Sequence, residues 1–78
     1  MIKVLFFAEL EEIVGRREVE LEQSSLTVTE LKQLLSERYP SLPELERFMV
    51  AINEEYGDDQ DVIKEGDTVA LIPPVSGG

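Results

Sequence analysis

Four short stretches of the chain combine β-branched, aromatic or alternating apolar residues, a pattern that predicts β-strands. They are Met1 to Ala8, Glu18 to Glu22, Phe48 to Asn53 and Thr68 to Ile72. On the first strand Ile2, Val4 and Phe6 would share one face, while Lys3, Leu5 and Phe7 lie on the other. Because that second face is also apolar toward the C-terminal end of the strand, we expect Leu5 and Phe7 to be covered by another segment or by a partner.

One longer segment has the features of an amphipathic helix. Thr27, with Glu30 three residues later, forms a capping-box pattern at its start, and Pro40 ends the helix near residue 38 or 39. Its apolar positions recur at helical spacing and form one stripe: Val28, Leu31, Leu34 and Leu35. We expect this stripe to pack against the predicted sheet as part of the core.

Shorter elements connect these segments. Glu9 to Val14 predicts a short helix that Gly15 ends, and a turn of helix is expected through about Arg47. Val62 and Ile63 would enter the core from a one-turn helix. Two segments carry turn residues: Glu54 to Gly57 and Glu65 to Asp67.

Strands early and late in the chain surround one main helix, which predicts an α+β domain of the β-grasp type. In such a domain a small mixed sheet packs on the helix, and we expect the first and last strands to lie side by side in its middle. With 78 residues, the chain is predicted to be a single domain spanning residues 1–78.

Composition removes several classes of function. The net charge of −10, from 17 acidic and 7 basic residues, opposes binding to nucleic acid or anionic membranes, and Arg16-Arg17 is too small a basic cluster to reverse this. The chain contains no cysteine and no histidine, so it lacks the usual neutral-pH general base. Asp58 to Asp61 does not begin an EF-hand, because Val69 stands where the twelfth-position glutamate is needed. We expect a cytoplasmic protein without a metal site or its own catalytic machinery.

The last six residues, Pro73 to Gly78, contain no charged side chain and end in two glycines. Gly77 and Gly78 lack a Cβ, so this end of the chain can enter a narrow channel. Pro73 and Pro74 restrict the backbone before it, which predicts a flexible tail over residues 73–78 with a stiff stem and a loose tip. Four residues beyond Pro74, at ~3.5 Å each, give a reach of ~14 Å. The terminal carboxylate would thus be presented deep inside another protein.

Three segments resemble the small, sulfur-carrying subunit of molybdopterin synthase, a ubiquitin-like family. They are Ile2 to Ala8, Ala51 to Asn53, and Glu65 to Gly78. The Gly-Gly end is shared by many ubiquitin-like proteins, whereas Gly-Asp-x-Val-Ala followed by Pro-Pro-Val-Ser-Gly-Gly is much more specific. The resemblance covers the whole chain and implies a β-grasp fold.

The resemblance also implies a chemistry. An E1-like adenylating enzyme would use ATP to activate the carboxylate of Gly78, and sulfur would then give a C-terminal thiocarboxylate. The large subunit of a heterotetrameric synthase would accept the tail and pass the sulfur to a cyclic pterin phosphate. This chain would then be a non-catalytic subunit without a stably bound cofactor.

Roles follow for individual residues. The resemblance implies that Gly78 would carry the sulfur and that five residues would give it access to the partner: Pro73, Pro74, Val75, Ser76 and Gly77. The resemblance places partner contacts at Phe7, Tyr56 and Ile72, of which Phe7 and Ile72 share a strand face with Leu5 and Ala70. That these three side chains are ordinary core remains an open alternative.

Three other functions remain open. A sulfur carrier of the thiamine type would share the fold and the Gly-Gly end, but such tails lack the Pro-Pro-Val-Ser stem. A ubiquitin-like protein modifier would attach to lysines, although ubiquitin has arginines just before its glycines and this chain has none after Arg47. A β-grasp interaction module would need no free terminus, so adding a residue after Gly78 distinguishes it from a carrier.

Overall fold

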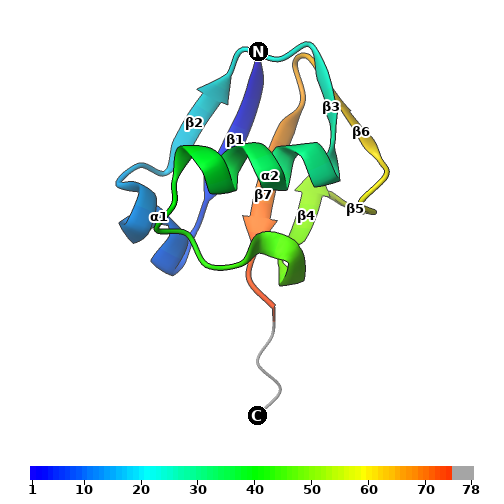
Figure 1. The fold of residues 1–78 in the computed structure, drawn as a ribbon. Helices are drawn as coiled ribbons and strands as arrows, with labels where there is room; N and C mark the ends of the chain where they lie inside the picture. Colours follow the sequence, from blue (N-terminus) through cyan, green and yellow to red (C-terminus); the bar gives the residue numbers. More distant parts are fainter. Residues whose placement is uncertain (75–78) are drawn as a thin grey trace.

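The computed structural model describes residues 1–74, and Val75 to Gly78 lie outside the described residues. Its strands are β1 (Ile2–Phe6), β2 (Glu18–Leu21), β3 (Ser25–Thr27), β4 (Met49–Ile52), β5 (Glu55–Gly57), β6 (Val62–Lys64) and β7 (Thr68–Ile72). Its helices are α1 (Ala8–Val14), α2 (Val28–Arg38) and the single 3₁₀ turn η1 (Leu45–Arg47). Helix α2 crosses one face of the main sheet, as Figure 1 shows.

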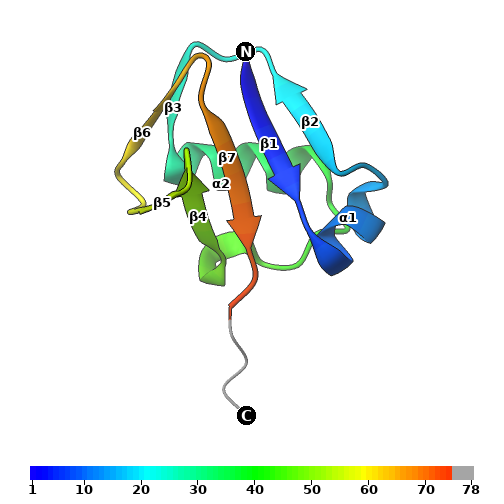
Figure 2. The ribbon, with the colours of Figure 1, turned by 180° about the vertical axis from the view of Figure 1, so that it is seen from behind.

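The main sheet has five strands in the order β2-β1-β7-β4-β5, and β3 pairs with β6 in a second, two-stranded sheet. The first and last strands of the chain, β1 and β7, lie side by side in parallel, with Val4 opposite Val69. Strand β4 runs antiparallel on the other side of β7. This arrangement confirms the predicted β-grasp fold and the central position of β7 (Figure 2).

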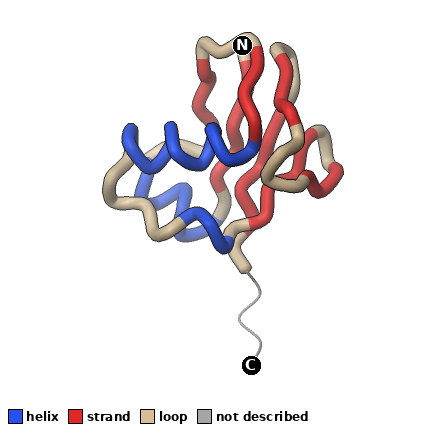
Figure 3. The backbone as a smooth tube through the Cα atoms, turned by 45° about the vertical axis from the view of Figure 1, so that its right-hand side comes forward, coloured by secondary structure: helices blue, strands red, loops and turns tan. Residues whose placement is uncertain are grey.

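The core lies between the main sheet and α2, with the helices on one side of the strands in Figure 3. Ile2, Val4 and Phe6 of β1 are all fully buried, and alternate residues on the neighbouring strands face the same way. Phe6 also meets Tyr39 edge-to-face, with ring centroids 6.1 Å apart. The predicted inward face of β1 is therefore confirmed.

Helix α2 begins and ends where local chemistry predicts. The hydroxyl of Thr27 accepts a hydrogen bond from the Glu30 backbone N–H, and the Glu30 carboxylate accepts one from the Thr27 N–H. The helix ends at Arg38, two residues before Pro40. Three predicted stripe residues are buried, whereas Leu34 is only partly buried at the edge of the core.

Two short segments differ from the prediction. Glu55–Gly57 is strand β5, paired with β4 across a two-residue loop, where only a turn was predicted. Val62 and Ile63 lie in strand β6 and not in a one-turn helix: Ile63 is fully buried, while Val62 is 50% exposed. Strand β6 pairs with β3, a strand that the hydrophobic pattern had not indicated. Three residues are too few to distinguish the two periodicities, so tertiary pairing decided these elements.

Candidate functional site

The face of the main sheet opposite α2 carries a shallow groove with a volume of ≈ 660 Å³. Its residues come from or adjoin β1, β4, β5 and β7: Leu5, Phe7, Ala51, Asn53, Glu54, Tyr56, Thr68, Ala70 and Ile72. We call this surface the outer-face groove. Within residues 1–74 no segment of the chain covers it as α2 covers the other face (Figure 2).

Strand register explains why the surface is hollow. Ala70 of β7 lies opposite both Leu5 of β1 and Ala51 of β4, so two methyl side chains occupy the centre of the face. Larger side chains stand around them, including Phe7 and Tyr56, which are 43% and 67% exposed. Small residues bordered by large ones produce a concave apolar surface, which is a shape that binding surfaces commonly have.

The structure brings together the three side chains for which partner contacts were predicted. Phe7, Tyr56 and Ile72 come from distant parts of the sequence, yet all three line the outer-face groove. None of them belongs to the buried core, so the alternative of ordinary core residues is wrong for all three. Whether they contact a partner stays a prediction.

Several groove residues were not predicted as site residues: Leu5, Ala51, Asn53, Glu54, Thr68 and Ala70. Strand alternation could have identified Ala51 and Ala70 as neighbours on one face once the strand order was known. Asn53 and Glu54 required knowledge of the β4–β5 hairpin, which the sequence pattern did not provide.

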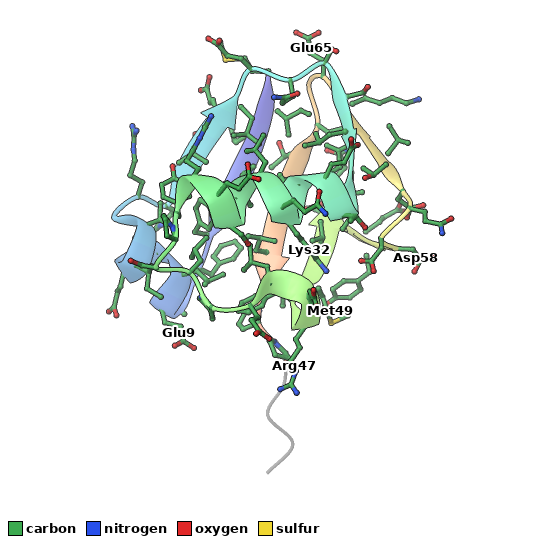
Figure 4. The ribbon with its side chains drawn as sticks, in the orientation of Figure 1. Glu9, Lys32, Arg47, Met49, Asp58 and Glu65 are labelled. Atoms are coloured by element: carbon green, nitrogen blue, oxygen red, sulfur yellow. The ribbon has the colours of Figure 1, made fainter. Side chains whose placement is uncertain are left out.

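The tail begins at the end of β7. Ile72 is the last residue of β7 and also lines the groove, and Pro73 and Pro74 follow it directly. Pairing of Ile72 with Met49 places η1 and Arg47 at this same end of the domain, as Figure 4 shows. The other predicted tail residues, Val75, Ser76, Gly77 and Gly78, lie outside the described residues.

A polar network holds the rim of the groove. The side-chain amide of Asn53 donates to the Asp67 carboxylate at 3.0 Å, and its carbonyl oxygen accepts from the Thr68 N–H at 3.0 Å. The backbone N–H of Lys64 donates to the other Asp67 oxygen at 2.8 Å. These hydrogen bonds, first that from Lys64 and then that from Asn53, lower the pKa of Asp67 below its ordinary value of 3.8.

Acidic side chains are dispersed over the rest of the surface. Glu9, Asp58 and Glu65 project from three separate places in Figure 4. Among residues 1–74, no group of three or more histidine, cysteine or acidic residues is arranged to hold a metal ion. In the same part of the chain, no helix has the length and apolar character needed to cross a membrane.

Comparison with known proteins gives concordant results. The family model described as the ThiS family matches residues 4–78. The molybdopterin synthase sulfur carrier subunit of Caenorhabditis briggsae is 38% identical, over 99% of this chain and 96% of that protein. The protein of the same name from Escherichia coli K12 is 37% identical, and the match spans 100% of both chains.

Solved structures show the same fold. Small archaeal modifier protein 1 (SAMP1) from Haloferax volcanii superposes with a TM-score of 0.79 at 29% identity, covering 99% of this chain and 98% of that one. A chain from the complex of subunits 1 and 2 of the molybdopterin-converting factor from Helicobacter pylori gives 0.68 at 26% identity, covering 99% and 97%.

The sheet order, the single crossing helix and the exposed end of a central strand define a ubiquitin-like β-grasp protein. Within that class, the chain belongs to the ThiS family.

Proposed function

We propose that this chain is the sulfur carrier subunit of molybdopterin synthase, with Gly78 as the carrier residue. The observation that supports this proposal most is the full-length match to proteins of that name, including the Escherichia coli subunit matched over 100% of both chains. The closing Pro-Pro-Val-Ser-Gly-Gly residues agree with it. The lack of any histidine or cysteine in the sequence also suits a subunit whose partners supply the catalytic groups.

The proposed chemistry has two activating steps. An E1-like enzyme joins the Gly78 carboxylate to the α-phosphate of ATP, which releases pyrophosphate and leaves an acyl-adenylate. A sulfide equivalent then forms a C–S bond at the carbonyl, and AMP departs with the electron pair of the broken C–O bond. The resulting thiocarboxylate is an ionised sulfur nucleophile at neutral pH, as thiolates generally are. We place these reactions in the cytoplasm, where ATP is available.

The position of β7 supports a carrier function mechanically. Strand β7 is hydrogen-bonded to β1 on one side and to β4 on the other, so Ile72 is tied to the rigid middle of the sheet. Pro73 and Pro74 continue from this anchored residue. The start of the tail is therefore held relative to any protein that docks on the neighbouring groove, which lowers the entropy lost when the tail is received.

We propose the outer-face groove as the docking surface for the large subunit of the synthase. Phe7 and Tyr56 provide exposed aromatic surface of the kind enriched at protein interfaces. The similar chain from Helicobacter pylori comes from a solved complex of subunits 1 and 2 of the molybdopterin-converting factor, which supports a two-subunit assembly for this chain as well. Sulfur transfer to a cyclic pterin phosphate would occur in the large subunit.

Intact mass spectrometry tests the carrier function directly. After incubation with ATP, the activating enzyme and a sulfur source, the chain should gain about 16 Da, because the reactive thiocarboxylate replaces one oxygen with sulfur. Fragmentation should place the gain on Gly78. A chain with one alanine appended after Gly78 serves as the control and should remain unchanged. An unchanged mass for the native chain with a competent activating enzyme contradicts the proposal.

A second candidate, a protein modifier, is favoured by the likeness to small archaeal modifier protein 1 at 29% identity. The same acyl-adenylate would then pass Gly78 to a lysine amine, giving an isopeptide bond. Proteolysis of cell extract followed by peptide sequencing distinguishes the two. Lysine residues bearing remnants of this tail support the modifier function, and thiocarboxylate without such remnants supports the carrier.

A further inference from the structure

The outer-face groove is apolar except at one corner. Of the residues that line it within the described part of the chain, only Glu54 carries a charged side chain. The others are apolar or neutral, and the small central residues Ala51 and Ala70 bring no polar group to the face. A partner that covers this apolar surface must also accommodate a negatively charged side chain at its edge.

Glu54 also occupies an unfavourable backbone conformation. It is the second residue of the two-residue loop between Ile52 and Glu55, which pair across the β4–β5 hairpin. The loop residues Asn53 and Glu54 have φ angles of 51° and 72°, the two positive values of a type I′ turn. Asparagine adopts this conformation readily, but the second position strongly favours glycine. Glycine fits this position better, so the backbone gives no reason for a glutamate here, and a role for its side chain would account for it.

The turn is firmly attached to β7. Besides the side-chain bonds of Asn53, its backbone N–H donates to the Thr68 carbonyl at 2.8 Å. Asp67, which precedes β7, accepts from the Asn53 amide. Glu54 is therefore held at a defined place beside the groove, next to the start of β7 and at the opposite end of that strand from Ile72, and Figure 2 shows the hairpin next to β7.

Within residues 1–74, Glu54 forms no ion pair. The ion pairs of these residues use four other carboxylates: Glu11, Glu18, Asp59 and Glu65. In the free protein, water solvates the exposed Glu54 carboxylate. A partner that covers the groove removes some of this water, and an unpaired carboxylate then opposes binding. A partner cation placed against the carboxylate offsets that penalty.

We infer that the large subunit presents an arginine or lysine side chain to Glu54 when it covers the outer-face groove. Arginine suits the position best, because its planar guanidinium binds a carboxylate through two parallel hydrogen bonds and stacks on aromatic rings such as Tyr56. The ion pair would set the orientation in which the groove and the tail are received together. This inference rests on the proposed function, since it assumes that the large subunit docks here.

Binding measurements with three single substitutions test the inference. Glu54→Gly removes the charge and the backbone strain, Glu54→Gln removes the charge alone, and Glu55→Gln removes a neighbouring charge. Glu55 is a matched control, because strand alternation directs it away from the groove that Tyr56 lines. Each purified chain is titrated by calorimetry with the large subunit from the same organism, and its Tm is recorded alone.

Both Glu54 variants should bind the large subunit about tenfold more weakly than the native chain, as expected for loss of one partner of a close charge pair. Glu54→Gly should nonetheless have a Tm no lower than that of the native chain, so weak binding cannot be attributed to unfolding. Glu55→Gln should bind within about twofold of the native chain, because it lies outside the contact.

Other outcomes overturn the inference in distinguishable ways. Native affinity in both Glu54 variants means that no cation faces this carboxylate. An equal loss in Glu55→Gln means that overall acidity, and not Glu54, promotes binding. If the Glu54 variants lose only adenylation by the activating enzyme, the assigned partner is wrong. If the native chain itself does not bind the large subunit, the proposed docking fails together with the inference, whereas the mass gain on Gly78 still tests the carrier chemistry independently.

Discussion

The two faces of the central strands both carry apolar side chains but have opposite surroundings. On the side of α2, side chains of β1, β4 and β7 are almost completely inaccessible: Val4, Phe6, Val50, Val69 and Leu71 are all at most 1% exposed. On the other side, Leu5, Ala70 and Ile72 are only partly buried, and Phe7 is 43% exposed. Adjacent residues of the same strands therefore experience different environments.

This difference separates the needs of folding from those of function. Apolar residues beneath α2 are explained by the hydrophobic effect, because their burial stabilises the domain. The same driving force does not explain Phe7, since no described segment covers it. A sheet with one solvated face normally has polar residues on that face. The apolar outer face is thus better explained by a partner than by the fold of this chain.

The largest expected effect concerns two adjacent phenylalanines. Phe6→Ala should lower the free energy of unfolding by about 3–5 kcal/mol, because it leaves a cavity in the core. Phe7→Ala removes the same side chain from the outer face and should lower it by no more than about 1 kcal/mol. Urea unfolding followed by circular dichroism measures both. Equal losses would show that the outer face is as important to folding as the inner face.

The second largest expected effect is on binding, and it tests whether the outer face differs from other exposed apolar surface. Phe7→Ala should weaken association with the large subunit by about 2 kcal/mol, roughly 30-fold, if this aromatic side chain is an interface hot spot. Ile13→Ala is the matched control, because Ile13 is 40% exposed on α1 but does not line the groove. Calorimetry should give an unchanged affinity for the control. Equal weakening of both variants would mean that exposed apolar area in general, and not the groove, determines binding.

The smallest expected effect is a pH-dependent change in stability caused by replacing Asp67. The pKa of Asp67 is lowered by hydrogen bonds from the Lys64 N–H and the Asn53 amide, so its ionised form is favoured in the folded state. The stabilisation that this provides is present above the ordinary pKa of 3.8 and is lost as pH falls through the lower folded value. Asp67→Asn should therefore be less stable than the native chain near pH 7, and the difference should shrink toward pH 3.

Urea unfolding of both chains across this pH range measures the difference. Glu9→Gln is the control, since no hydrogen bond or ion pair of the Glu9 side chain is present among the described residues, and it should show little pH-dependent difference from the native chain. If the difference in free energy of unfolding between Asp67→Asn and the native chain were the same at every pH, ionisation of Asp67 would not stabilise the folded chain.

The longer elements were predictable because several residues repeat one period. Strands β1, β2, β4 and β7 and helix α2 each show enough positions to reveal alternation or a helical stripe, and the Thr27 capping box marked the helix start. Strands β3, β5 and β6 have three residues each, so the same reasoning failed there. Their conformation depends on pairing with strands distant in sequence, which local patterns do not record.

The candidate site was predictable only in part. Resemblance to a known family led to Phe7, Tyr56 and Ile72, and the structure places all three on one groove. Composition excluded cysteine and histidine chemistry without any structure. By contrast, Glu54 looked like an ordinary turn residue until the hairpin showed its positive φ angle and its place beside the groove.

The sequence by itself determined the alternation of apolar residues, the start and end of α2, the acidic character and the glycine-rich closing residues. These properties are local, because each depends on side chains within a few positions of one another. Only the tertiary structure decided which apolar face α2 covers and which remains open. That choice depends on how strands far apart in the chain pair, and burial is a property of the assembled layers.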